Sequence, residues 1–413
     1  MTLSTTTTGR QFPPPSQMRG WLRDDGRKGI RNTVVIAYLV ECAHHVSQQI
    51  ARPFEGEDVH VIGFPGCFPN PYAQDIMEKL CTHPNVGAVL LLSLGCESFN
   101  KRKLARAVER SGRPVHTLTI QQAGGTRTTM EAGRLWIRAA LDTLAKQPTV
   151  PMTVSELVIG TVCGGSDGTS GITGNPAAGR AFDQFVSEGA TCIFEETGEL
   201  IGCEHIMADR AATPELGAEL ISAVDKAARY YQAMGYGSFA PGNADGGLTT
   251  IEEKSLGAYA KSGASPISGI VKPGISPPHG GLYLLDVVPD GEPRFGFPNI
   301  NDNAEIVELI SCGAHAVIFV TGRGSVVGSA ISPIIKVCAN PETFRKMPDD
   351  MDVDAGRIIE GRGTLAEVGE EIHDKIVALG AGARTVSEEL GHREFILTYK
   401  SFEPLGPACL PAA

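Results

Sequence analysis

The stretch VGAVLLLSL, residues 86–94, decides the fold class. It is short, rich in valine and leucine and almost free of polar side chains, which is typical of a strand buried on both faces of a parallel sheet. The stretch KRKLARAVERSG, residues 101–112, follows it and repeats apolar side chains with helical spacing. A buried strand followed by an amphipathic helix is the repeating unit of α/β proteins.

The same unit recurs on both sides of this stretch. The other strand and helix pairs are NTVVIAYLV (32–40) with HHVSQQIAR (44–52), VHVIGF (59–64) with NPYAQDIMEKL (70–80), and VHTLTI (115–120) with a helix inside 128–147. These pairs predict a doubly wound parallel α/β domain, Rossmann-like or flavodoxin-like, over residues 18–150. Residues 1–17, rich in threonine and proline, are predicted to form a flexible lead-in.

A second, larger α/β domain is predicted over residues 151–413, and we expect it to carry most of the site. The prolines in KQPTVPMTVSE, residues 146–156, mark the boundary between the two domains. Strand and helix patterns follow this boundary and are interrupted once. The interruption, residues 236–300, is rich in glycine and proline, and we predict an extended excursion packed over the core.

The composition narrows the classes of partner. The 413 residues carry a formal net charge of -11, which argues against a nucleic-acid partner because phosphate binding needs a basic face. Local arginines still permit a small anionic substrate. No apolar run approaches the roughly 20 residues of a membrane span, and the N-terminus lacks the pattern of a secretory signal. We therefore expect no membrane association and a cytoplasmic location, where the ten cysteines stay reduced.

Four of the strand-like runs end on a cysteine, at Cys42, Cys67, Cys96 and Cys163. Residues that follow the carboxyl ends of parallel strands can meet at one crevice. Glycines flank Cys67, Cys96 and Cys163 and let the backbone approach a ligand closely, so these three are candidate iron ligands. Cys42 has no neighbouring glycine and leads into a helix, and we predict a structural role for it. No CxxC spacing supports the trio, so a structural role stays open for its members too.

The glycine-rich loop CGGSDGTSGITGNPAAG, residues 163–179, raises the question of nucleotide binding. It lacks GxxxxGK[ST], and the first strand of the chain is not followed by GxGxxG, so both standard phosphate motifs are absent. Ser166, Asp167 and Ser170 suit recognition of a polyhydroxylated substrate. Asn175 either contacts the substrate or caps a helix that begins at the next residue, a proline.

Two polar segments offer candidates for proton transfer. EETGELIGCEH, residues 195–205, gathers acidic groups after a strand, and Glu204 with His205 could bind a metal or move protons near neutral pH. Glu195 is expected on a solvated acidic loop. Lys254, in TTIEEKSLG, is the other candidate, with a surface ion pair to a neighbouring glutamate as its ordinary explanation.

Two arginine-containing segments could bind an anionic substrate. Arg323 follows a strand in FVTGRGS, residues 319–325, and has the fork geometry that fits a carboxylate, with Ser325 beside it as a further substrate contact. Arg31 precedes the first strand in DDGRKGIRN, residues 24–32. That segment forms either a second anion site or an ion-paired loop.

Together these pieces resemble the altronate and galactarate dehydratase family of sugar-acid hydro-lyases. The matching stretches are GWLRDDGRKGIRN, GCE, CGGSDGTSGITGNPA, ETGELIGCEH, GNADGGLTTIEEKSLG, TGRGSVVG and DDMDVDAG, in order from Gly20 to about Gly356. Seven motifs in sequence are specific, whereas single glycine motifs are not.

The resemblance implies β-elimination from a hydroxy acid, commonly iron-dependent dehydration that gives a 2-keto-3-deoxy acid. The iron would be Fe2+ or an iron–sulfur cluster. Because an α-proton beside a carboxylate is weakly acidic, such an enzyme needs a cation or donors for the enediolate, a base, and an acid for the leaving group. We assign carboxylate binding to Arg323, and metal or leaving-group contact to the three glycine-flanked cysteines. We assign proton transfer to His205, aided by Glu204, or to Lys254.

The sequence departs from the family pattern in two places. Fewer than twenty residues precede the GWLRDDGRKGIRN stretch, where full-length dehydratases carry a small SAF domain, so we expect the large subunit of a split enzyme, a small SAF-domain partner and an oligomer. The related sulfo-lyases, which eliminate sulfite from sulfolactate, share that arrangement. Asp245 in GNADGG also departs from the usual GNKAGG. Sulfite release is therefore an alternative, and a non-catalytic substrate-binding paralogue is an alternative of another class.

Overall fold

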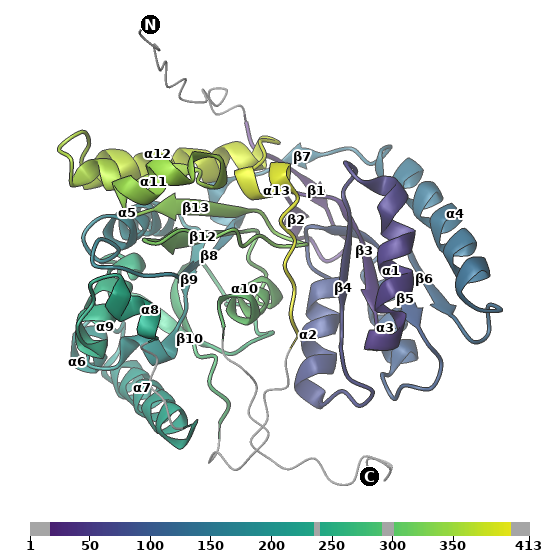
Figure 1. Ribbon diagram of the computed structural model, residues 1–413, viewed down its shortest axis with the longest axis horizontal. Helices are drawn as coiled ribbons and strands as arrows, with labels where there is room; N and C mark the ends of the chain where they lie inside the picture. Colours follow the sequence, from purple (N-terminus) through teal and green to yellow (C-terminus); the bar gives the residue numbers. More distant parts are fainter. Residues whose placement is uncertain (1–16, 235–239, 291–300, 398–413) are drawn as a thin grey trace, which may run out of the picture.

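The computed structural model describes residues 17–234, 240–290 and 301–397 and contains two α/β lobes (Figure 1). The N-terminal lobe is built on a four-stranded parallel sheet in the order β4-β3-β5-β6. Its strands are β3 (Thr33–Tyr38), β4 (Val59–Gly63), β5 (Val86–Ser93) and β6 (Val115–Thr119). Every residue of β5 is buried, which accounts for its unbroken apolar run.

Four helices cover both faces of this sheet. They are α1 (His44–Ala51), α2 (Pro71–Cys81), α3 (Lys101–Arg110) and α4 (Thr126–Leu144). Alternate residues of β5 point to opposite faces. Leu90 packs in the same cluster as side chains of α1 and α4, and Leu91 in the same cluster as side chains of α2 and α3. The predicted doubly wound α/β fold is therefore confirmed for this lobe.

The C-terminal lobe is built on a seven-stranded parallel sheet in the order β10-β11-β9-β8-β12-β13-β14. Its strands are β8 (Val158–Cys163), β9 (Thr191–Phe194), β10 (Ile267–Val271), β11 (Gly281–Leu285), β12 (Ala316–Thr321), β13 (Ile334–Cys338) and β14 (Val353–Asp354). Its helices are α5 (Gly174–Ser187), α6 (Glu204–Ala208), α7 (Pro214–Met234), α8 (Pro241–Asp245), α9 (Ile251–Tyr259), α10 (Asp302–Ser311), α11 (Pro341–Lys346), α12 (Leu365–Gly380) and α13 (Val386–Leu390). α5 and α12 pack on one face of the sheet, and α10 packs against β8 on the other.

The prediction of an extended excursion over residues 236–300 is wrong for its described part. That part contains α8, α9, β10 and β11, and the two strands extend the central sheet beside β9. Each strand is only five residues long and is flanked by glycine and proline, so the local composition hid a short buried run. Residues 236–239 and 291–300 of the predicted excursion lie outside the described residues.

A small antiparallel sheet and several buried side chains join the lobes. The sheet consists of β1 (Arg19–Leu22), β2 (Lys28–Gly29) and β7 (Val150–Pro151). His315 accepts a hydrogen bond from the Val158 amide on Nδ1, at 2.9 Å, and Nε2 donates to the Lys28 carbonyl, at 2.8 Å. No helix in the described part of the chain is both long and apolar enough to cross a membrane.

Candidate active site

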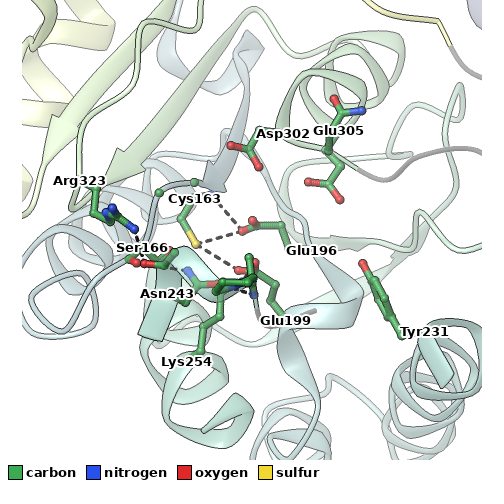
Figure 2. Close-up of a pocket in the computed structure, with 16 residues that line it drawn as sticks. Cys163, Ser166, Glu196, Glu199, Tyr231, Asn243, Lys254, Asp302, Glu305 and Arg323 are labelled. Carbon is green, nitrogen blue, oxygen red and sulfur yellow. Dashed lines mark hydrogen bonds and ion pairs between the residues drawn. The ribbon is translucent and has the colours of Figure 1, made fainter. Parts of the chain in front are cut away.

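A cavity of about 540 Å³ opens beyond the carboxyl ends of β8, β9 and β12 in the C-terminal lobe (Figure 2). Ligands of parallel α/β sheets bind at this edge. The residues that line it with polar or ionisable side chains are Cys163, Ser166, Glu196, Glu199, Tyr231, Asn243, Lys254, Asn301, Asp302, Glu305 and Arg323. The cavity therefore gathers charged groups of both signs.

Cys163 is the last residue of β8 and its thiol lies among charged groups. The Sγ atom is 3.2 Å from Oε2 of Glu196, 3.5 Å from Oε2 of Glu199 and 3.5 Å from Nζ of Lys261. Burial raises the pKa of the Cys163 thiol to about 11, against the opposing charge of Lys261. Without a metal ion, the thiol is therefore protonated at neutral pH.

Glu196 is held in an unusual backbone conformation. Among the described residues it is the one non-glycine residue with a positive φ, of 83°. Its carboxylate accepts the amide N–H of Cys163 at 2.9 Å and forms an ion pair with Lys261, which is fully buried. Such a conformation costs on the order of 1–3 kcal/mol and persists where the surroundings fix it, often at functional sites.

Lys254 is the second buried lysine of the site. It lies on α9, is 7% exposed and forms an ion pair with Glu199 instead of the neighbouring glutamates on its own helix. Burial alone would lower the pKa of Lys254, but the charge and hydrogen bond of Glu199 outweigh burial and raise it. Lys254 is therefore a cation at neutral pH, directed into the cavity (Figure 2).

Asp302 and Arg323 add an ionisable carboxyl group and a second cation. Burial, together with the negative charge of Glu199, raises the pKa of Asp302 to about 6, against the opposing charge of Lys254. The Asp302 carboxylate lies so close to Gly164 that a Cβ atom there would be 2.0 Å from Oδ2. Arg323 is exposed, and its guanidinium donates to the Gly242 carbonyl.

A second cavity of about 250 Å³ adjoins the first and shares Ser166 and Lys254 with it. Asp167, Ser170 and Asn175 line it. The helix-cap alternative for Asn175 is wrong, because α5 begins at Gly174 and its N-cap is Thr173. The Asn175 Oδ1 atom is buried and has no hydrogen-bond partner among the described residues.

Several predicted site residues lie away from both cavities. His205 is exposed at the start of α6, and Oε1 of Glu204 accepts the Gly202 amide at 2.8 Å. Ser325 accepts the Val327 amide at 3.2 Å, which fixes its own loop. None of the three predicted residues lines either cavity.

Arg31 is a structural residue in this fold, so its prediction as a substrate contact is corrected. It is 6% exposed, and its Nε atom lies 2.7 Å from Oε1 of Glu388. Its guanidinium also donates to the carbonyls of Leu379 and Ala383, at 3.1 and 2.7 Å. The ion-paired alternative therefore describes this segment.

The predicted trio of cysteine ligands does not converge. Cys67 and Cys96 are exposed on loops after β4 and β5, in the N-terminal lobe, because their strands belong to a different sheet from that of Cys163. Two other sets have donor atoms within 4.8 Å of one another in the described part of the chain: Cys163, Glu196 and Glu199, and Glu195, Glu196 and Glu305. Glu195 is fully buried, not on a solvated loop as expected.

Sequence reasoning missed several residues of the cavity. Glu196 and Glu199 lie in the acidic segment that was noted, but neither was singled out, although both follow directly on β9. Asp302 is the first residue of α10, and Asn301 caps this helix. An asparagine cap in the sequence predicts where a helix starts, but not where that helix lies in the fold. No local pattern marks Lys261, which reaches Glu196 only through tertiary packing.

Two family models match the chain. The family model described as D-galactarate/Altronate dehydratase, C-terminal, matches residues 154–402, and the model described as D-galactarate dehydratase/Altronate hydrolase, second domain, matches residues 20–145. The chain is 32% identical to the (2R)-sulfolactate sulfo-lyase subunit beta of Chromohalobacter salexigens, over 92% of this chain and 96% of that protein.

Two dehydratases of Escherichia coli K12 are similar to a comparable degree. The altronate dehydratase is 31% identical over 91% of this chain and 76% of its own length. The galactarate dehydratase (L-threo-forming) is 31% identical over 76% of this chain and 60% of its own length. The chain belongs to the D-galactarate/altronate dehydratase family.

Proposed function

We propose that this protein is a lyase that removes the α-proton of a small hydroxylated carboxylic acid and expels a group from the β-carbon. The observation that carries the proposal is one cavity holding a buried cationic Lys254, an Asp302 with a pKa of about 6, and an arginine at its edge. A base close to neutrality and a fixed cation are the two requirements of enediolate formation.

Each of these residues has a role that follows from its charge. Arg323 would bind the substrate carboxylate through its planar fork. Asp302, ionised above about pH 6, would take the α-proton. Lys254 would stabilise the enediolate and donate a proton to the leaving group, since its raised pKa keeps it protonated at neutral pH.

The leaving group is proposed to be water and the substrate a sugar acid, which gives a 2-keto-3-deoxy acid. The adjoining cavity supports this choice, because it extends the space past Ser166 and Lys254 and is lined by Asp167, Ser170 and Asn175. Hydroxyl, carboxylate and amide groups of this kind would bind the hydroxyls of a chain longer than three carbons.

A second candidate is release of sulfite from sulfolactate. A specific observation favours it: the sulfo-lyase subunit matches this chain over 96% of its length, whereas the altronate dehydratase matches over 76%. That relative is called a subunit beta, so we also propose that this chain works with a smaller partner subunit.

The donor set in the cavity fits a divalent transition-metal ion, and we propose iron. Cys163, Glu196 and Glu199 would hold it, since a thiolate and two carboxylates suit this class of ion. The ion would supply positive charge to the developing oxyanion. Binding of the ion would also deprotonate Cys163. Its positive charge would replace part of the charge with which Lys254 and Lys261 neutralise Glu199 and Glu196.

The experiment incubates the purified chain, alone and with a partner subunit, with altronate, galactarate and sulfolactate under anaerobic conditions. The 2-keto acid and sulfite are measured in each mixture. Keto acid from a sugar acid, without sulfite from sulfolactate, is the expected result. Sulfite alone would establish the second candidate, and no product from any acid would contradict the proposed lyase.

A further inference from the structure

The exposed cysteines of this protein share one location. In the described part of the chain three cysteines are exposed: Cys42, after β3, Cys67, after β4, and Cys96, after β5. The other described cysteines are buried, as is usual for this residue type. Exposed thiols are open to oxidation. Because these three side chains are exposed, packing in a core does not explain why cysteines follow three adjacent strands.

The strand register places these three cysteines at equivalent positions, the same number of residues beyond aligned residues of their strands. Tyr38 of β3 pairs with Gly63 of β4 and with Leu92 of β5. Each cysteine is the fourth residue after one of these aligned positions. Figure 1 shows β3 between β4 and β5, so the three cysteines follow neighbouring strands at the carboxyl edge of the sheet, Cys67 and Cys96 on loops and Cys42 in a short 3-10 helix (Glu41–Ala43).

Contacts between the loops bring the outer two together. The amide and the hydroxyl of Ser98 both donate to the Cys67 carbonyl, at 2.9 Å each. The Cys67 and Cys96 loops therefore meet, although their strands are separated by β3. Glu97 fixes the second loop, because its carboxylate accepts the Gly95 amide at 2.8 Å and the Ser93 hydroxyl.

The helices α1, α2 and α3 each follow one of the three cysteines and begin at this edge. Iron–sulfur clusters are held by cysteine thiolates, usually four, so three would leave one iron without a protein ligand.

The spacing of the donor atoms argues against a single ion. In the described part of the chain these cysteines belong to no set of three donors within 4.8 Å of one another. A single ion needs thiolates that close, since each sulfur lies about 2.3 Å from the metal. A cluster holds its thiolates farther apart, because each of them binds a different iron atom.

We propose that Cys42, Cys67 and Cys96 hold an iron–sulfur cluster in which one iron has no protein ligand. This site is on the N-terminal lobe and is separate from the divalent ion proposed beside Cys163. The glycine-flanked motifs predict Cys163 as the third ligand beside Cys67 and Cys96. The strand register indicates Cys42 in its place.

The test is anaerobic reconstitution of the full chain with iron and sulfide, followed by desalting. Iron, acid-labile sulfide and visible absorption are then measured for the wild type and for the variants Cys42→Ser, Cys67→Ser and Cys96→Ser. The wild type is expected to retain about four sulfide per protein chain, with about four iron in addition to any ion bound beside Cys163. Each variant is expected to lose at least half of the sulfide and of the absorption. Because the side chains are exposed, the thermal unfolding midpoint without the cluster should not change.

Cys163→Ser is the matched control, and it is expected to retain the sulfide and the visible absorption. The proposal would be overturned by wild-type protein without acid-labile sulfide, by zinc bound in its place, or by a Cys67 to Cys96 disulfide in protein kept anaerobic. Equal sulfide in the wild type and in the three variants would overturn it as well. A loss of absorption in Cys163→Ser alone would place the cluster in the cavity and overturn the proposal as well.

Discussion

Replacing Arg31 by methionine is expected to lower the free energy of unfolding by about 3–5 kcal/mol, the cost of breaking a buried ion pair. The guanidinium contacts both Glu388 oxygens, at 2.7 and 2.9 Å, and several backbone carbonyls. Only 14% of the Glu388 side chain is exposed, so the variant would leave a poorly solvated carboxylate without its cation. Urea unfolding at neutral pH measures the difference.

The pH dependence of the same variant gives a second readout. Burial alone would raise the pKa of Glu388, but the hydrogen bond and charge of Arg31 hold it below its usual range. The unfolded chain therefore binds this proton more readily, and the stabilisation is present above about pH 4 and is lost as the pH falls further. The difference between wild type and variant should shrink accordingly in acid.

Arg27→Met is the matched control, since Arg27 forms an exposed ion pair with Asp25 at 2.6 Å. It is expected to cost less than about 1 kcal/mol. If Arg31→Met were as stable as Arg27→Met but bound substrate more weakly, Arg31 would be a substrate contact and the structural role would be refuted.

Three further variants test the site and the joint between the lobes. Arg323→Met is expected to raise KM by about 10- to 100-fold, the loss of a charge-assisted contact to the substrate carboxylate, and an unchanged KM would exclude that role. Gly164→Ala would place a Cβ atom 2.0 Å from Oδ2 of Asp302, so we expect a fall in kcat of about 100-fold with retained fold by circular dichroism; full activity would show that this carboxylate is not positioned for catalysis. His315→Ala is expected to cost about 1–3 kcal/mol because it leaves the Val158 amide and the Lys28 carbonyl unpaired. Burial lowers the pKa of His315 to about 4, so on acidification the unfolded chain binds this proton before the folded protein does. Wild-type stability should therefore fall as the pH drops from about 6.5 towards 4, and more steeply than that of the variant. Equal pH dependence of the two proteins in urea unfolding would contradict this.

Strand and helix patterns predicted the N-terminal lobe well because each strand of its sheet is short, apolar and followed by an amphipathic helix. β5 is the best case, with every residue buried. The same reasoning failed for β10 and β11, where glycine and proline surround five-residue strands. These strands are stabilised by pairing with each other and with β9, a long-range effect that local composition does not encode.

The site was predicted only in part, for a related reason. Cys163, Ser166 and Arg323 follow strands, and strand ends gather at one edge of a parallel sheet, so their common cavity could be foreseen. Which sheet a strand joins cannot be read from spacing, so the prediction groups Cys67 and Cys96 with Cys163, whose strand belongs to the other sheet. The buried Lys261 carries no local signal, because its role depends on the pairing with Glu196.

The central claim, that this cavity abstracts an α-proton, is tested most directly by the release of α-hydrogen. The acid that turns over is labelled with deuterium on the α-carbon, and release of the label to water is followed by NMR between pH 5 and 8. Wild type should release the label with a rate that rises through about pH 6, and Asp302→Asn should be slower by about 100- to 10,000-fold without that rise. The exposed control Asp349→Asn should match wild type. Label release by Asp302→Asn at the wild-type rate, with the same pH profile, would contradict the account.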